Sequence, residues 1–241
     1  MVSSGIETYR NGIGGRALTP DPRRARRLEV IEQVVTCTAC DLGGPGVPPT
    51  IIDRPVTVVA GAPDGTEAGL EELEPFLAHA GIGPVSWVHA VACPTIQVTP
   101  NHIEACVGNL HAQLEATRAG HDQPFVLLVG LPALKAVRPD LDLVYGRGRP
   151  FRSENRNDPT VFYAIFDPRR PHHTDDLIDG LDTFARLVAA DNWVDFIPDT
   201  CSACNDRWVW IDDPAGLGWC EQHLPAAGRA HFERLAALKA G

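Results

Sequence analysis

Short apolar runs alternate with amphipathic stretches along most of this chain, and turn residues separate them. Four apolar runs are bounded in the way that buried strands are, at Val56–Ala60, Trp87–Ala92, Phe125–Gly130 and Val161–Phe166. Amphipathic stretches predict helices at 28–36, 71–80, 132–137 and 176–190, and Thr99-Pro100 is a helix start that combines an N-cap with a proline in the first turn. This alternation predicts an α/β fold of three αβα layers around a mainly parallel sheet.

A parallel sheet places its functional loops together, because they follow the carboxyl ends of the strands. The turns at 61–67, 89–99 and 167–173 lie in such positions. We therefore expect candidate chemistry in these three turns.

The composition sets the domain organisation. Residues 1–27 are rich in Gly, Pro, Ser and Arg without apolar periodicity, which predicts a flexible arm. Residues 28–192 are long enough for one α/β domain, and residues 193–241 form a small C-terminal module that ends in a helix. No apolar stretch has the length of a membrane span and no secretory signal is present, so we expect a cytoplasmic protein, acting as a monomer without a membrane partner.

The formal net charge of −10 argues against a protein that coats nucleic acid nonspecifically. A local basic face remains compatible with DNA binding. The second of two arginine groups contains Arg147 and Arg149, with Arg169 and Arg170 nearby in sequence. The alternative is that these arginines lie in solvated loops.

The C-terminal module carries the spacing of a zinc site. Cys201-Ser-Ala-Cys204 is followed after fifteen residues by Cys220-Glu-Gln-His223. Two chelating pairs at this spacing can close a tetrahedral site of three sulfurs and one nitrogen, which is typical of structural zinc. We predict that this Zn²⁺ supplies much of the folding free energy of the module.

Four cysteines remain, at positions 37, 40, 93 and 106. In a reducing compartment they indicate metal binding before disulfides. Their spacing alone is compatible with zinc, with an iron–sulfur cluster or with two buried thiols.

The residues around these cysteines resemble a known family. VVTCTACDL is similar to the opening Thr-Cys-x-x-Cys-x-Leu of the iron–sulfur uracil-DNA glycosylases of families four and five. VHAVACP and TPNHIEAC resemble the segments that carry that family's third and fourth cysteines, and VTVVAGAPDG, EPFLAHAGI, FVLLVGLPALKAV and YAIFDPRRPHH resemble further segments in the same order. The resemblance covers roughly residues 28–190. It implies a uracil-DNA glycosylase-like fold, DNA as the partner, and a structural 4Fe–4S cluster bound by Cys37, Cys40, Cys93 and Cys106.

The same resemblance implies site residues. Gly61 and Ala62 fall in the first catalytic motif and His89 falls where the family reads the edge of the base, so these three are candidate base-binding residues. Phe76 falls where the family stacks a phenylalanine on the flipped base, and Arg169 and Arg170 fall in the loop that probes the duplex.

The polar positions of the family's chemistry are substituted here. Gly61 replaces a glutamate, His89 replaces an asparagine and Asp167 replaces a histidine, so uracil specificity does not carry over. Asp64 and Asp167 are candidates to orient water or stabilise the sugar cation, and His89 is a candidate hydrogen-bonding group toward the base. The alternatives are that Asp167 caps a turn before Pro168 and that His89 is a core residue.

Three functions remain open from the sequence. The first is a DNA glycosylase that hydrolyses the N-glycosidic bond of a flipped, non-standard or modified base, in DNA repair or in viral-DNA modification or defence. The second is a catalytically inactive DNA-binding protein on the same scaffold. The third is a metal-stabilised interaction module with no DNA role.

Overall fold

The computed structural model describes most of the chain between residues 21 and 190 and short pieces after it. The described ranges are 21–63, 69–153, 157–169, 174–190, 210–212, 217–219, 229–230 and 233. For residues 144, 145, 174, 210–212 and 217–219 only the backbone is described. Asp64, Arg170 and the four predicted zinc ligands lie outside these ranges.

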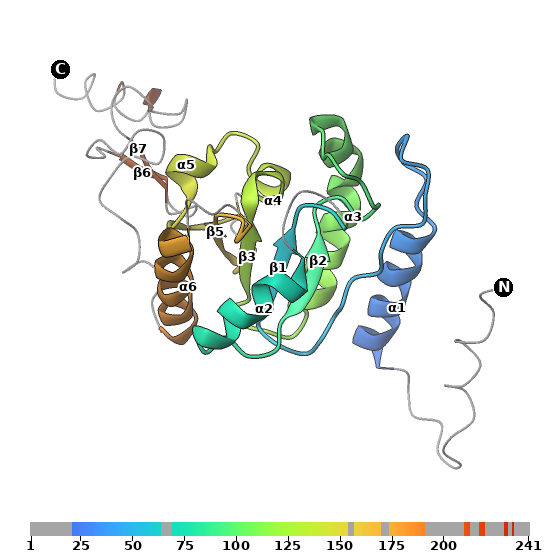
Figure 1. The fold of residues 1–241 in the computed structure, drawn as a ribbon, viewed down its shortest axis with the longest axis horizontal. Coiled ribbons are helices and arrows are strands. Elements are labelled where there is room, and N and C mark those ends of the chain that lie inside the picture. The colour runs from blue at the N-terminus through green and yellow to red at the C-terminus, as the bar shows by residue number, and fades with distance from the viewer. Residues whose placement is uncertain are drawn as a thin grey trace, which may run out of the picture.

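A five-stranded, mostly parallel sheet forms the centre of the molecule (Figure 1). Its strand order is β2 (Ser86–His89), β1 (Val56–Ala60), β3 (Phe125–Val129), β5 (Val161–Ile165) and β4 (Pro150–Arg152). The first four strands are parallel, and β4 pairs with β5 in the antiparallel direction at one edge. Side chains on both faces of β1, β3 and β5 are buried, which explains why these strands are continuous apolar runs.

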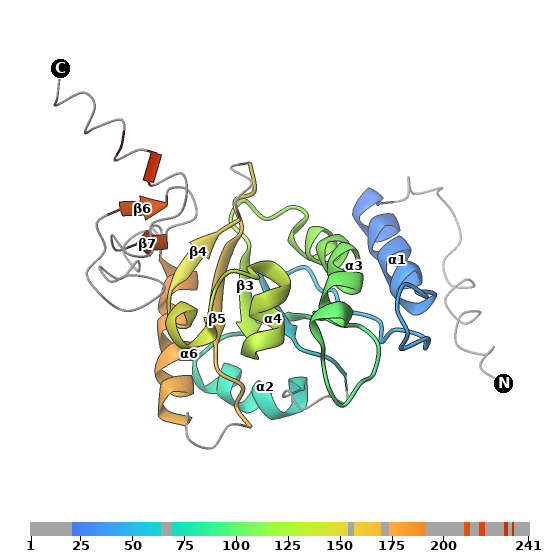
Figure 2. The ribbon, with the colours of Figure 1, turned by 90° about the horizontal axis from the view of Figure 1, so that it is seen from above.

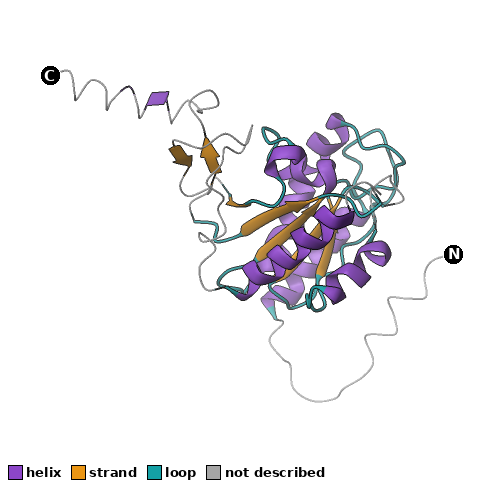
Figure 3. Ribbon diagram, turned by 60° about the vertical axis from the view of Figure 1, so that its left-hand side comes forward, coloured by secondary structure: helices purple, strands orange, loops and turns teal. Residues whose placement is uncertain are grey.

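Helices cover both faces of this sheet, as Figure 3 shows. Leucines of α2 (Leu70–His79) and α6 (Thr174–Ala189) pack with the sheet on one face. Side chains of α3 (Pro100–Arg118) and α4 (Gly130–Val137) pack on the other face. The predicted α/β fold with helices on both faces of a mainly parallel sheet is therefore confirmed.

An additional helix, α1 (Pro22–Val35), lies against α3 rather than against the sheet (Figure 2). It begins six residues before the predicted start, so residues 22–27 are helical and the expected boundary of the flexible arm at residue 27 is wrong. The reason is local: the Asp21 side chain accepts a hydrogen bond from the Arg23 N–H, and Pro22 occupies the first turn. The segment 1–20 of that predicted arm lies outside the described residues.

The other predicted elements are present with small shifts at their ends. Thr99 caps α3 as expected, since its hydroxyl accepts from the His102 N–H at 3.3 Å. The second strand ends at His89 instead of Ala92. Four short elements were not predicted: β4, α5 (Leu143–Gly146) and two strands of the C-terminal module.

Two short strands lie in the predicted C-terminal module. β6 (Trp210–Asp212) and β7 (Leu217–Trp219) pair antiparallel, with Trp210 opposite Trp219. This hairpin lies in sequence between the two predicted chelating pairs, and zinc binding itself stays a prediction. In the part of the chain that the structure describes, no helix has the length and apolar character needed to cross a membrane.

Candidate functional site

The four N-terminal cysteines come from three separate elements and meet in one region. Cys37 and Cys40 follow α1, Cys93 follows β2, and Cys106 lies in α3. All four are free thiols, with Cys93 and Cys106 buried and the other two partly buried.

Individual contacts connect these thiols. The Asn109 side-chain amide donates to the Cys37 sulfur at 3.1 Å, and Asn109 lies one helical turn after Cys106. The Cys93 thiol donates to the Gly44 carbonyl at 3.6 Å, in the segment that follows Cys40.

The ionisation of the buried thiols reflects the same proximity. Burial raises the pKa of Cys106 to about 11, and the nearby thiols of Cys40, Cys93 and Cys37 add to this increase. Burial also raises the pKa of Cys93, again with contributions from Cys40 and Cys37. Cys93 and Cys106, whose raised pKa values disfavour ionisation, would be stable as thiolates with a positive charge beside them.

The metal-binding role of these four cysteines stays a prediction. Within the described ranges, no group of three or more His, Cys, Asp or Glu side chains could hold a metal ion as the side chains stand. In the predicted arrangement, the thiolates of Cys37, Cys40, Cys93 and Cys106 would hold a 4Fe–4S cluster.

The cysteine region packs directly against the first candidate loop. Ala62, Val91 and Cys106 form one buried apolar cluster, and Leu42 packs against it from the segment after Cys40. The Val91 N–H donates to the Gly61 carbonyl at 2.9 Å. The structure thus brings the cysteines, Gly61 and Ala62 together at the carboxyl end of β1 and β2.

His89 lies at the same edge of the sheet, paired with Ala60 in the register of β1 and β2. Its side chain is 8% exposed, and its Nε2 accepts a hydrogen bond from the Trp87 indole at 3.2 Å. This bond assigns the neutral tautomer with the hydrogen on Nδ1, so Nδ1 is the donor of the ring.

Asp167 follows β5, and β3 lies between β5 and β1 in the sheet. Its side chain is 3% exposed and accepts a hydrogen bond from the Arg169 N–H at 2.9 Å. The Arg169 guanidinium lies 3.6 Å from the same carboxylate oxygen. Asp167 therefore caps a turn, as the structural alternative supposed, while lying at the edge where the catalytic interpretation requires it.

Phe76 and the candidate DNA-binding arginines occupy mixed environments. Phe76 is partly buried and packs against the core from α2. Arg147 is 34% exposed, lies over the Phe166 ring at 4.5 Å and pairs with Asp176 at 3.6 Å. Arg149 is only 7% exposed, so little of its side chain is available to a phosphate at the surface.

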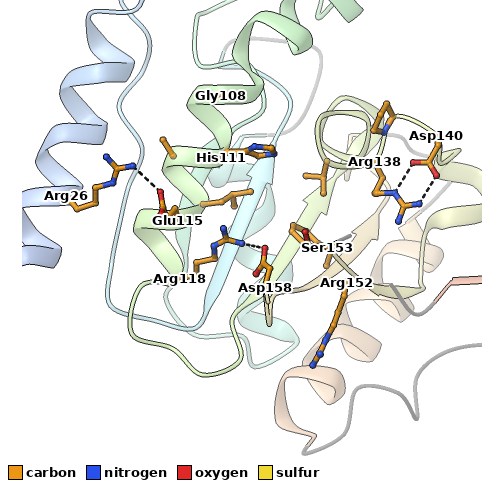
Figure 4. Close-up of a pocket in the computed structure, with 15 residues that line it drawn as sticks. Arg26, Gly108, His111, Glu115, Arg118, Arg138, Asp140, Arg152, Ser153 and Asp158 are labelled. Atoms are coloured by element: carbon orange, nitrogen blue, oxygen red, sulfur yellow. Dashed lines mark hydrogen bonds and ion pairs between the residues drawn. The ribbon is translucent and has the colours of Figure 1, made fainter. Parts of the chain in front are cut away.

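A cleft of about 900 Å³ lies elsewhere and contains none of the predicted site residues (Figure 4). Its charged lining comes from α1, α3, the end of α4 and the segment around β4, and consists of Arg26, Glu115, Arg118, Arg138, Asp140, Arg152 and Asp158. Several of these form ion pairs with one another, including Arg118 with Asp158 and Arg138 with Asp140. Sequence patterns do not reveal this cleft, because its lining is assembled from segments far apart in the chain.

Comparison with known proteins adds no family assignment: no family model matches the chain, and no curated protein matches it either.

Proposed function

We propose that this protein is a DNA glycosylase that hydrolyses the N-glycosidic bond of a flipped, modified base, with a 4Fe–4S cluster that holds its site loops in place. One observation carries the proposal. The four-thiol region packs through Cys106 against Ala62 in the loop that would receive the base. The bound cluster would hold α1, α3 and this loop in fixed positions relative to one another.

The edge around Gly61 suits a base larger than uracil. Gly61 has no side chain, which leaves room where the resembling family has a glutamate. His89 offers an Nδ1–H donor next to it in the sheet register, fixed by the Trp87 hydrogen bond. A donor of this kind stabilises the negative charge that develops on a departing base.

The sugar must be stabilised by a negatively charged group of the protein. As the glycosidic bond breaks, positive charge develops on the deoxyribose, and a carboxylate beside it orients water and stabilises that charge. Among the described residues, Asp167 has a carboxylate at the carboxyl edge of the sheet, and we assign this role to it. Arg169, bound to Asp167, would then place a positive charge beside the DNA backbone.

A specific observation favours a second function, a DNA-binding protein without hydrolysis. Asp167 is engaged by both the backbone N–H and the guanidinium of Arg169. A carboxylate used in this way is a normal turn cap and does not need a catalytic role.

The discriminating experiment is base release from duplexes that each carry one modified base, read as strand breakage after alkali. We expect abasic product from at least one duplex with cluster-loaded protein. Asp167→Asn should lower that rate by about 10²-fold or more, the scale of a lost general base. Asp182→Asn, which changes an exposed carboxylate of α6, is the matched control and should keep the wild-type rate.

Each outcome selects one function. If Asp167→Asn releases the base at the wild-type rate, Asp167 has no catalytic role. Tight DNA binding without release on any duplex supports the inactive binding protein. Absence of both binding and release contradicts both functions.

A further inference from the structure

The cleft of about 900 Å³ in Figure 4 takes no part in the proposed function. Its size lies within the range of about 300–1,000 Å³ that is usual for small-molecule sites. The cleft opens between Arg118 in the last turn of α3 and Asp158 just before β5, at the amino end of the sheet. Gly61 and His89 lie at the carboxyl ends of β1 and β2, so the cleft and the candidate base site occupy opposite ends of the sheet.

The lining of the cleft is positive although the protein is acidic. Four arginines and three acidic residues line it, which gives a formal charge of +1, whereas the whole chain has a formal charge of −10. A partly enclosed cleft with walls of low dielectric constant strengthens the field of such charges. We therefore expect the cleft to attract anions.

Arg118 is held so that half of its guanidinium stays open. Its Nη1 donates to the Asp158 carboxylate and, at 2.9 Å, to the Thr160 hydroxyl (Figure 4). Asp158 is 12% exposed and Thr160 is fully buried, so both partners belong to the fixed frame of the fold. In the part of the chain that the structure describes, Nε and Nη2 of Arg118 donate to no group. These two neighbouring N–H groups match two oxygens of one phosphate.

Arg26 supplies a second guanidinium at the rim of the cleft. It comes from α1 and pairs with Glu115 of α3 at 3.0 Å, and the Glu115 side chain is 64% exposed. Exposed ion pairs of this kind contribute little to stability. A phosphate that enters the cleft can therefore replace the Glu115 carboxylate beside Arg26 at small cost.

One wall of the cleft is apolar. Leu114, Val137 and Phe162 line it, and all three pack with the core cluster between the sheet, α3 and α4. Small-molecule sites combine apolar surface of this kind with a few placed polar groups. The cleft thus offers guanidinium groups to a phosphate and apolar surface to an attached organic group.

We propose that the cleft binds an organic phosphate of nucleotide size, with its phosphate on Arg118 and Arg26 and its organic part against the apolar wall. The position of the cleft favours a small molecule over the phosphates of a DNA strand, because the candidate base site lies at the other end of the sheet. The proposal does not depend on the glycosylase function.

The test is isothermal titration calorimetry of the full-length protein with AMP, ADP and inorganic phosphate as probes. Arg118→Gln and Arg26→Gln each remove one guanidinium, and Glu115→Gln removes the carboxylate that competes with the phosphate. The matched controls make the same changes of charge outside the cleft lining: Arg24→Gln at an exposed position of α1 and Glu104→Gln at an exposed position of α3. Thermal melting of each variant shows that it is folded at the temperature of the titration.

We expect AMP and ADP to bind more tightly than inorganic phosphate, because only they contact the apolar wall. Arg118→Gln and Arg26→Gln should each weaken AMP binding about tenfold, the scale of one lost charge-assisted hydrogen bond. Glu115→Gln should strengthen AMP binding about threefold, the scale of one exposed ion pair. Both controls should keep the wild-type affinity.

Three results would overturn the proposal. The first is that wild type binds none of the probes. The second is that AMP binds equally well to wild type, Arg118→Gln, Arg26→Gln and Glu115→Gln, or no more tightly than inorganic phosphate. The third is that the two arginine variants weaken binding of duplex DNA while AMP neither binds nor competes, which would assign the cleft to DNA.

Discussion

Gly46 lies where the segment after Cys40 passes between α1 and the end of β2. A Cβ atom at this position would stand 2.5 Å from the Val34 carbonyl oxygen, 2.9 Å from Val34 Cγ1 and 3.3 Å from Ala92 Cβ. The Val47 N–H donates to the Ala92 carbonyl at 2.7 Å and fixes the segment at this spacing. The helical carbonyl of Val34 cannot rotate away, so Gly46→Ala must displace the segment.

The size of the effect follows from this overpacking. Forcing extra volume into a well-packed region costs about 1–3 kcal/mol. For a domain of this size each kcal/mol corresponds to roughly 2–4 °C in Tm, so the middle of that range, about 2 kcal/mol, lowers the Tm of Gly46→Ala by about 4–8 °C. The displacement also moves the Gly44 carbonyl, which accepts from the Cys93 thiol at 3.6 Å, so the iron content should fall as well.

The matched control is Gly44→Ala, two residues away in the same loop. A Cβ atom there would meet only the Leu42 carbonyl oxygen at 3.7 Å, an ordinary contact. Thermal melting and iron content are measured on both variants after the same anaerobic purification. Equal Tm and equal iron in the two variants would refute the close packing of this segment between α1 and β2.

Three further changes test other parts of the structure. Asn109→Ala removes the N–H donor to the Cys37 sulfur, and release of iron to a chelator should become about tenfold faster, as for other outer-shell metal partners. The pKa of Asp158 lies below its ordinary value. Burial is the largest single influence and raises this pKa, but hydrogen bonds and the positive charge of Arg118 together lower it by more. The stabilisation that this lowered pKa gives the folded state is present above about pH 4 and is lost as the pH falls through the pKa of the folded state. Arg118→Ala should therefore lower the free energy of unfolding by about 1–2 kcal/mol at pH 7. Melting curves of the variant and the wild type should differ less at pH 3. His223→Ala should lower the zinc content of the purified protein without changing its iron content, as elemental analysis would show.

The central strands of this fold could be predicted because strands that are buried on both faces consist mostly of consecutive apolar residues. Phe125–Val129 is an unbroken apolar run and Val56–Ala60 is interrupted only by Thr57, and turn residues bound both. The β4 strand is only three residues long and begins with a proline, so no periodicity marks it. The start of α1 was missed because its arginines resemble a solvated arm until Asp21-Pro22 is recognised as a helix cap.

The candidate site could be predicted only in part. The position of Gly61 and His89 at one edge follows from parallel strands. The meeting of Cys37 with Cys106 requires α1 to pack on α3, which spacing in the sequence cannot predict. The burial of Arg149 could not be predicted either. A group of arginines close together in sequence does not indicate which of their side chains are buried at the edge of a sheet.

The proposed function depends on an iron–sulfur cluster that four cysteines bind behind the base site. Iron and acid-labile sulfide, counted per chain in anaerobically purified protein together with its low-temperature EPR spectrum after reduction, test it most directly. We expect about four irons and four sulfides per chain, and loss of both in Cys106→Ser. A colourless wild-type protein without iron or sulfide would contradict it.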